Sequence, residues 1–420
     1  MRPRVAENLT RAVLSNGLTV VVKPSPGTGA VTLHGFVKAG AMLDDARPGI
    51  ARFVGAMLMH GTMRRTAQEL AVDVDAMGAN LTVIPGMEST TITGRSLRDD
   101  LPALLRDAAE VLMTPAFPSE EAERVRGQLL TAVRVNALDT RQAAERLFRR
   151  LAFPDGHPHS RHPDGDEAVL ADLSTHDLRA FHGRHFRPEA AALVVVGEIQ
   201  ADRAVDLVRE ATGAWPAAGM WALPPFGTDG AARGPRRAEI RLAGKTQADL
   251  ALGGPGIART DPDYYAFMMA NLLLGQLGMM GRIGENVRER QGMAYYAFSD
   301  LRAGLLAGPW WVRAGVSPAN IDRAVDAITS EIRTLQRDGP DPEELADARR
   351  FLVGSLAVRL ETSQGVAGAL ADIEFYGLGL DYLQRYPSII ESVRRDDLVA
   401  AIRRFPADGH VLAIARPEPP

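Results

Sequence analysis

The order of secondary-structure patterns in this chain repeats once, at an offset that stays near 220 residues. The amphipathic helix pattern of residues 101–113 returns at residues 321–335, and the apolar strand pattern of residues 193–196 returns at 411–415. A repeat of this length indicates a duplicated domain, because the units of a solenoid are shorter. The alternative, two unrelated α+β domains, stays open at this point.

A segment without periodicity separates the two copies. Residues 216–236 are rich in proline and glycine, a composition typical of a linker. We therefore expect an N-terminal half at residues 1–215 and a C-terminal half at residues 237–420. Each half combines short strand patterns with longer helix patterns, so the expected fold class is α+β. The length of 420 residues agrees, because it exceeds what one hydrophobic core normally supports.

Residues 49–62 form the most informative motif of the first half. Apolar residues recur there at helical spacing, which predicts one amphipathic helix ending near Gly61. In the inverted zinc motif His-x-x-Glu-His, two histidines bind the metal and the glutamate activates water, all within about one helical turn. The three corresponding positions carry Arg52, Gly55 and Ala56. Arginine has no lone pair to give a metal, and the other two have no functional group, so we expect no zinc on this helix.

The surrounding residues resemble the metal helix of the pitrilysin/insulinase family of zinc metallopeptidases, the inverzincins. The matching residues of the helix are Phe53, Met57, Leu58, Gly61 and Thr62. Further matching segments are Gly78-Ala79-x-Leu81, Lys245-Thr246-Gln247 and Arg288-x-x-x-Gly292-x-x-Tyr295. The resemblance implies two homologous α/β-sandwich halves, each a mixed sheet with helices on one side. It also implies that two halves face each other as a clam shell around a peptide.

The resemblance also assigns roles to particular positions. The family's third zinc ligand, a glutamate, corresponds to a position near Ala132, and residues 129–134 contain no carboxylate. Arg288 and Tyr295, by contrast, match an intact second-half signature. In active members this arginine and tyrosine hold the substrate backbone and the oxyanion of the tetrahedral intermediate. Donors already aimed at developing charge lower the barrier of such reactions.

Other interpretations of these two residues need no family. Arg288 can form a surface ion pair with Glu285 or Glu289. Tyr295 can belong to the core, with Tyr296 as the exposed neighbour. The sequence alone leaves both interpretations open.

His157, His159 and His162 form the densest histidine cluster of the chain. Imidazoles are common metal ligands, so a metal site is one interpretation. The other is a surface loop, because prolines and glycines interrupt regular structure around the cluster.

We interpret the chain as the non-catalytic subunit of a heterodimeric zinc metallopeptidase, inactive alone. A homologous partner would carry the zinc motif and its zinc, and this chain would need no cofactor. It would close the chamber around a peptide substrate and supply Arg288 and Tyr295. One alternative is an inert structural scaffold of the same fold. Another is a self-sufficient hydrolase that uses the three histidines of the cluster.

Composition excludes several other classes of protein. A net charge of -4 and a pI of about 6.2 provide no basic footprint for nucleic acid. The absence of cysteine excludes disulfides and thiolate metal sites. No segment approaches the ~20 apolar residues of a membrane span, and residues 1–8 lack the apolar core of a secretory signal. We therefore expect a cytoplasmic protein, and the predominance of arginine over lysine suggests a GC-rich, bacterial genome.

Overall fold

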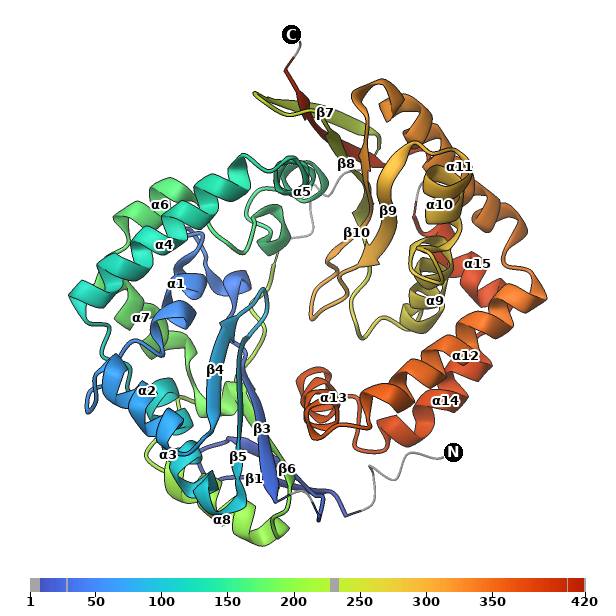
Figure 1. Cartoon of the computed structure of the whole chain (residues 1–420). Helices are drawn as coiled ribbons and strands as arrows, with labels where there is room; N and C mark the ends of the chain where they lie inside the picture. Colours follow the sequence, from blue (N-terminus) through green and yellow to red (C-terminus); the bar gives the residue numbers. More distant parts are fainter. Residues whose placement is uncertain (1–7, 28, 227–233, 406, 419–420) are drawn as a thin grey trace. The chain divides into compact units, whose positions relative to one another are not determined.

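The computed structural model describes residues 8–27, 29–226, 234–405 and 407–418. Residues 1–7 of the N-terminus and residues 227–233 of the expected linker lie outside the described residues. The chain forms two compact units (Figure 1). The first unit comprises residues 1–133, 163–225 and 356–385, and the second comprises residues 134–162, 226–355 and 386–420.

A six-stranded mixed sheet forms the centre of the first unit. Its strands are β1 (Thr10–Val13), β2 (Thr19–Pro24), β3 (Ala30–Val37), β4 (Asn80–Pro85), β5 (Thr90–Leu97) and β6 (Ala191–Gly197). They lie in the order β1-β2-β6-β3-β5-β4, with β2 and β6 parallel and the other neighbours antiparallel. A turn that contains Asn16 and Gly17 joins β1 to β2, and Gly17 has a φ of 88°, a conformation that glycine adopts without strain.

The second unit repeats this arrangement with five strands. They are β7 (Arg236–Leu242), β8 (Ala248–Pro255), β9 (Ala294–Leu301), β10 (Pro309–Val316) and β11 (Val411–Pro417). Their order is β7-β11-β8-β10-β9, with β7 and β11 parallel and the other neighbours antiparallel. Order and directions match those of β2 to β6 strand for strand, which favours duplication over two unrelated domains. The expected α+β fold with two mixed sheets is confirmed.

Helices cover these sheets and connect their strands. The first unit contains α1 (Ile50–Met57), α2 (Ala67–Ala76), α3 (Leu101–Met113), α6 (Glu167–Asp172), α7 (Thr175–His185), α8 (Ala201–Thr212) and α13 (Ser363–Tyr376). The second contains α5 (Thr140–Ala152), α9 (Tyr264–Gly275), α10 (Gly281–Gly284), α11 (Ile321–Asp338) and α15 (Arg395–Arg403). Three helices continue from one unit into the other: α4 (Ser119–Ala137), α12 (Pro342–Arg359) and α14 (Tyr382–Ser392).

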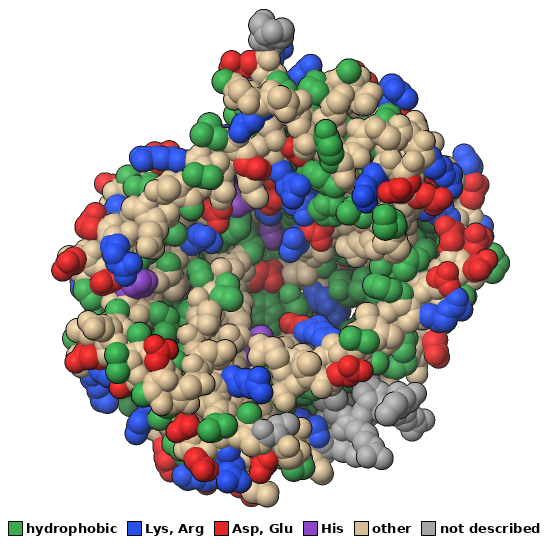
Figure 2. Space-filling view, viewed as in Figure 1, with side chains coloured by type: hydrophobic (Ala, Val, Ile, Leu, Met, Phe, Trp, Pro, Cys, Tyr) green, Lys and Arg blue, Asp and Glu red, His purple; other side chains and the backbone are tan. Residues whose placement is uncertain are grey.

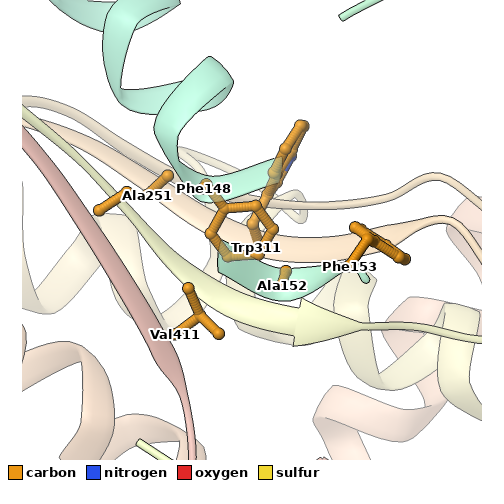
Figure 3. Packing of buried hydrophobic residues seen from close by; sticks show 7 residues of the cluster. Phe148, Ala152, Phe153, Ala251, Trp311 and Val411 are labelled. Carbon is orange, nitrogen blue, oxygen red and sulfur yellow. The ribbon is translucent and has the colours of Figure 1, made fainter. Parts of the chain in front are cut away.

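The two halves of the sequence exchange one helix each. Helix α5 comes from the first half but packs on β7, β8 and β11, and α13 comes from the second half but packs on β3 and β6. Figure 3 shows Phe148 and Ala152 of α5 against Ala251, Trp311 and Val411 of the second sheet. The division at residues 1–215, 216–236 and 237–420 thus describes the repeat in the sequence, whereas the compact units combine segments of both halves.

Because of the exchanged helices, each sheet is covered by helices on both faces. The resemblance had implied helices on one side only. Adjacent tryptophans of β10 show the two faces of the second sheet. Trp310 packs its ring against Phe267 of α9, with ring centres 5.8 Å apart, and Trp311 packs against Phe148 of α5 at 5.1 Å. Successive residues of a strand point to opposite faces, so α9 and α5 lie on opposite sides of this sheet. Its central strands are therefore almost fully buried.

The outer surface agrees with the composition. Acidic and basic side chains are interspersed over the face shown in Figure 2. Among the residues that the structure describes, no helix is long and apolar enough to cross a membrane.

Candidate functional site

Helix α1 carries the altered zinc motif. Its N-terminus is held by the buried carboxylate of Asp44, which accepts hydrogen bonds from the backbone N–H groups of Gly49 and Ala51 at 2.7 and 2.9 Å. This arrangement satisfies N–H groups that the first helical turn leaves without partners. The helix ends at Met57, which is earlier than the predicted end near Gly61.

The position that the resemblance assigns to the first metal ligand is occupied by an ion pair. The Nη1 atom of Arg52 lies 3.1 Å from Oδ1 of Asp164, and the Arg52 side chain is about one-third exposed at 35%. A guanidinium has five donors and no acceptor. Arg52 therefore neutralises a loop carboxylate and offers nothing to a cation.

At the position that the resemblance assigns to the catalytic glutamate, a proline fills the space for a side chain. Gly55 is buried, and a β-carbon at this position would lie 2.6 Å from Cβ and 2.9 Å from Cγ of Pro85. Pro85 ends β4, so glycine at position 55 allows α1 to approach this strand closely. A longer side chain at residue 55 has no room unless α1 or β4 moves.

The positions that the resemblance assigns to the second histidine and to the third zinc ligand carry only methyl side chains. Ala56 on α1 and Ala132 on α4 are both partly buried. Across the described ranges, no group of three or more histidine, aspartate or glutamate side chains is placed to hold a metal ion. The residues at positions 52, 55, 56 and 132 therefore do not fit a zinc ion.

Arg288 and Tyr295 lie on a helix-to-strand connection in the second unit. Arg288 belongs to a short π-helical segment, Glu285–Arg290, and Tyr295 lies near the start of β9. Gly292 between them has a φ of 60°. The helical segment thus ends before Gly292, and the strand that follows contains Tyr295. π-helical turns are rare and occur frequently at functional sites.

Both side chains are available to a ligand. Tyr295 is 76% exposed. Arg288 is about one-third exposed, and its Nε atom lies 3.5 Å from Oε1 of Glu289. An exposed ion pair at this distance contributes little stability, so Arg288 can exchange Glu289 for another acceptor.

Tyr296, and not Tyr295, is the packed residue of this pair. Its hydroxyl donates a hydrogen bond to Oδ1 of Asp249, and the guanidinium of Arg141 lies 4.2 Å from the centre of its ring. Burial and the neighbouring Asp249 carboxylate raise the pKa of Tyr296 above its ordinary value. The interpretation that Tyr295 belongs to the core and Tyr296 is exposed is therefore wrong.

Asp249 is a functional candidate that the sequence reasoning missed. It is 3% exposed on β8 and accepts hydrogen bonds from the hydroxyls of Thr140 and Tyr296 and from the side-chain amide of Gln247. It thereby joins the start of α5 to β9 and explains the glutamine of the Lys245-Thr246-Gln247 segment. The available signal was an aspartate at the start of an otherwise apolar strand.

A polar hollow of about 510 Å³ opens beside this carboxylate. It lies between the first turn of α5 and the connection from β7 to β8. Its charged lining residues are Asp139, Arg141, Lys245 and Asp249. Acidic and basic groups are balanced there, so charge alone selects neither an anion nor a cation.

The histidine cluster is a packed loop. His157 and His159 are only 7% and 5% exposed, and the ring of Phe153 stacks on His157 with centres 4.9 Å apart. The Nδ1 atom of His157 accepts a hydrogen bond from the backbone N–H of His159. Burial lowers the pKa of His159 to about 3. The surface-loop interpretation is therefore wrong, and the neutral rings serve packing.

Comparison with protein families identifies the fold. Residues 19–155 match the model described as insulinase, peptidase family M16, and residues 172–352 match the model described as the peptidase M16 inactive domain. This chain belongs to the M16 peptidase family. The match extends over both halves of the repeat, so the resemblance inferred from the motifs is confirmed.

Individual M16 relatives are distant but cover nearly the whole chain. An uncharacterized zinc protease of Streptomyces coelicolor is 26% identical, and the alignment covers 94% of this chain and 86% of that protein. The β subunit of the mitochondrial-processing peptidase of Caenorhabditis elegans is 23% identical, with 95% and 88% covered. The crystal structure of a peptidase M16 inactive domain from Pseudomonas fluorescens superimposes with a TM-score of 0.91 over 98% of each chain, at 23% identity. This last similarity establishes the fold.

Proposed function

We propose that this M16 chain is the non-catalytic subunit of a heterodimeric zinc metallopeptidase. A homologous partner would bind the zinc. This chain would close the peptide-binding chamber with it and contribute Arg288 and Tyr295 to substrate and transition-state binding. The single observation that carries the proposal is a contrast between two segments. On helix α1, the positions of the altered zinc motif are paired or tightly packed. The side chains of Arg288 and Tyr295, by contrast, are accessible to a ligand.

The closed metal helix argues against hydrolysis by this chain alone. Arg52 is paired with Asp164, and Pro85 fills the space next to Gly55. Both changes are packed into the surrounding structure. Such a site is not a zinc site that merely lacks its metal.

The open segment argues for a remaining role in catalysis. Arg288 and Tyr295 present two kinds of donor, a guanidinium fork and a phenol hydroxyl, and within the described residues neither has a strong partner. Neither group can activate water, so each would act on a peptide whose hydrolysis the partner performs. The Caenorhabditis elegans relative is named as one subunit of a peptidase, which supports a two-chain enzyme.

Reconstitution with a zinc-bearing M16 chain encoded beside this one tests the proposal. Each chain alone and the equimolar mixture are incubated with a set of quenched fluorescent peptides, and the mass of the complex is measured by light scattering. We expect a one-to-one complex, with an interface of about 1,200 Å² or more, and cleavage that requires both chains and stops with a chelator.

Two results would contradict the proposal. Chelator-sensitive cleavage by this chain alone would show an independent hydrolase. A one-to-one complex in which this chain adds nothing to the activity of its partner would favour the inert scaffold instead.

A further inference from the structure

Tyr295 lies at an irregularity in the pairing of β9 with β10. Gly315 of β10 pairs with Tyr296, and the next residue, Val316, pairs with Ala294, so Tyr295 is an extra residue on β9. A β-bulge of this kind bends its strand and re-aims a side chain. β9 is also the edge strand of the described sheet, where it pairs with β10 alone. The direction of the Tyr295 side chain therefore depends on what fixes its neighbours.

Tyr296, which directly follows the extra residue, is confined by contacts with three other residues. Its hydroxyl donates a hydrogen bond to Oδ1 of Asp249 and accepts one from Nε of Arg141 at 3.1 Å. The guanidinium of Arg141 also lies 4.2 Å from the centre of the ring. Gly315 leaves room for this ring, because a β-carbon on residue 315 would lie 2.6 Å from Cε1 of Tyr296. The side chain of Tyr296 is thus fixed along its whole length.

Asp249 is a firm anchor for the Tyr296 hydroxyl. It lies on β8, which β10 separates from β9, and it is almost fully buried. The hydroxyl of Thr140 and the side-chain amide of Gln247 also donate to its carboxylate. Burial and the hydrogen-bonded Asp249 carboxylate raise the pKa of Tyr296, so the hydroxyl keeps the proton that it donates. Hydrogen bonds to an ionised acceptor are roughly twice as strong as neutral ones. The contact therefore ties the edge strand to the interior of the sheet.

We propose that the hydrogen bond between Tyr296 and Asp249 positions Tyr295 for its contact with a peptide. Tyr296 and Asp249 are positioning residues in this account, because they set the direction in which the bulge presents the Tyr295 hydroxyl and need not touch the peptide themselves. The effect on turnover rests on the proposed function. The effect on the conformation of the bulge does not, so the chain alone can test it.

Hydrogen exchange of the full chain measures the positioning without a partner or a substrate. Tyr296→Phe removes only the hydroxyl and leaves the exposed Tyr295 in place. Exchange of the backbone amides of residues 293–297, followed by mass spectrometry, should accelerate by about tenfold, which corresponds to the loss of one hydrogen bond. Unchanged exchange in this segment would overturn the proposal.

Two comparisons separate a local effect from a general one. A loss of global stability accelerates exchange of all the most protected amides, so acceleration in every segment of Tyr296→Phe would contradict a positioning role. Tyr265→Phe is the matched control, because it removes a hydroxyl that lies 3.4 Å from Nη2 of Arg259 elsewhere in the second unit. It should leave exchange of residues 293–297 unchanged.

Gly315→Ala tests the same positioning without removing a hydrogen-bonding group. The added methyl group would displace the ring of Tyr296, so exchange of residues 293–297 should again accelerate. Gly354→Ala is the control, because a β-carbon on this residue of α12 meets no atom within 4 Å. Equal exchange of the segment in the two alanine variants would contradict the role of the Tyr296 ring.

Turnover of the reconstituted pair tests whether Tyr296 acts through Tyr295. Tyr296→Phe should lower kcat by about tenfold or more with little change in KM, because a small misplacement of a group that acts on the transition state slows the reaction. In a Tyr295→Phe background the same substitution should have no further effect, because the group that it positions is already absent. Tyr265→Phe should retain full turnover. Losses that add in the double variant would show that Tyr296 acts independently and would overturn the proposal.

The two experiments distinguish failure of this inference from failure of the proposed function. Full turnover in Tyr295→Phe would remove Tyr295 from the mechanism and count against the proposed function. Exchange of residues 293–297 in Tyr296→Phe would still decide whether the contact with Asp249 fixes the bulge. Reduced turnover in Tyr295→Phe, with wild-type turnover and wild-type exchange in Tyr296→Phe, would support the proposed function and overturn the positioning role.

Discussion

Gly55 on α1 and Pro85 at the end of β4 are in such close contact that a β-carbon on residue 55 would lie 2.6 Å from the β-carbon of the proline. Real β-carbons essentially never approach another atom this closely. The space that the first carbon of a glutamate side chain at residue 55 would need is therefore filled. The altered motif is thus a packed part of the first unit, and its reversal has a structural cost.

The first prediction concerns this contact. Gly55→Ala should lower the free energy of unfolding by about 1–3 kcal/mol, the usual range for overpacking a well-packed site. Gly127→Ala is the matched control, because Gly127 is an exposed helical glycine with no atom near the added methyl group. It should instead stabilise the protein by up to about 1 kcal/mol. In a Pro85→Gly background the penalty at residue 55 should shrink. Urea unfolding measures all four variants, and an equal effect at both glycines would exclude the steric explanation.

The second prediction concerns zinc. The triple variant Arg52→His, Gly55→Glu, Ala56→His should not bind one zinc per chain. Pro85 obstructs the new glutamate, and Ala132 provides no third carboxylate. Elemental analysis after dialysis against a low concentration of zinc measures the stoichiometry. One tightly held zinc per chain in the triple variant, and none in the wild type, would contradict this account of the site.

The third prediction concerns Arg288 and Tyr295. Arg288→Ala and Tyr295→Phe should each reduce the turnover of the reconstituted pair by roughly 10²- to 10³-fold, if the contact forms mainly in the transition state. Assembly should be unaffected, because Tyr295 is exposed and Arg288 has one weak ion pair with Glu289. Arg290→Ala, which removes an exposed arginine paired with Glu285, is the control and should retain full turnover.

Steady-state kinetics at confirmed one-to-one assembly separates the possible outcomes. If the contacts form equally in the ground state, the apparent affinity should fall instead of the turnover. Wild-type turnover and Michaelis constant in both variants would remove the two residues from the mechanism.

The fourth prediction follows from the exchanged helices. Residues 1–215 and 237–420, expressed separately, should each remain largely unfolded, because α5 supplies Phe148 to the second unit and α13 supplies Phe375 to the first. Expressed together, the two fragments should form a folded complex with the far-UV and near-UV circular dichroism of the intact chain. A cooperative unfolding transition in either fragment alone would contradict the prediction.

A point substitution in the exchanged helix gives a second measure. Phe148 is fully buried, so Phe148→Ala should cost about 3–5 kcal/mol. Phe351→Ala is the control, because Phe351 is 47% exposed on α12. It should change the free energy of unfolding by much less.

The fifth prediction concerns acid. Burial, with the nearby Arg149 and His157, lowers the pKa of His159 from 6.5 to about 3. Below pH 6.5 the unfolded chain binds a proton that the native chain does not, so this residue should reduce stability progressively as the pH falls from about 6.5 towards 3. The slope it contributes is at most about 1.4 kcal/mol per pH unit. His159→Gln should flatten the pH dependence of the unfolding free energy, and His176→Gln, at an exposed histidine, should not. Equal slopes in the wild type and His159→Gln would contradict this assignment.

The sequence was sufficient for the features that depend on local pattern and on residue chemistry. Residues 101–113 were predicted as a helix and form α3 with the same bounds. The repeat near 220 residues is matched by two sheets of the same strand order. The absence of ligand chemistry at Arg52, Gly55 and Ala56 follows from their side chains alone, since no arrangement of the chain can give them a lone pair.

Only the tertiary structure decided which parts of the chain meet. The helix patterns of α5 and α13 do not reveal that each packs on the sheet of the other half, because amphipathicity specifies an apolar face and not its partner. The choice between Tyr295 and Tyr296 depended on Asp249, which lies 47 residues away in sequence from Tyr296. The lack of room for a side chain at residue 55 depended on the contact with Pro85, at the end of a strand. These contacts join residues far apart along the chain, and local sequence carries no signal for such distances.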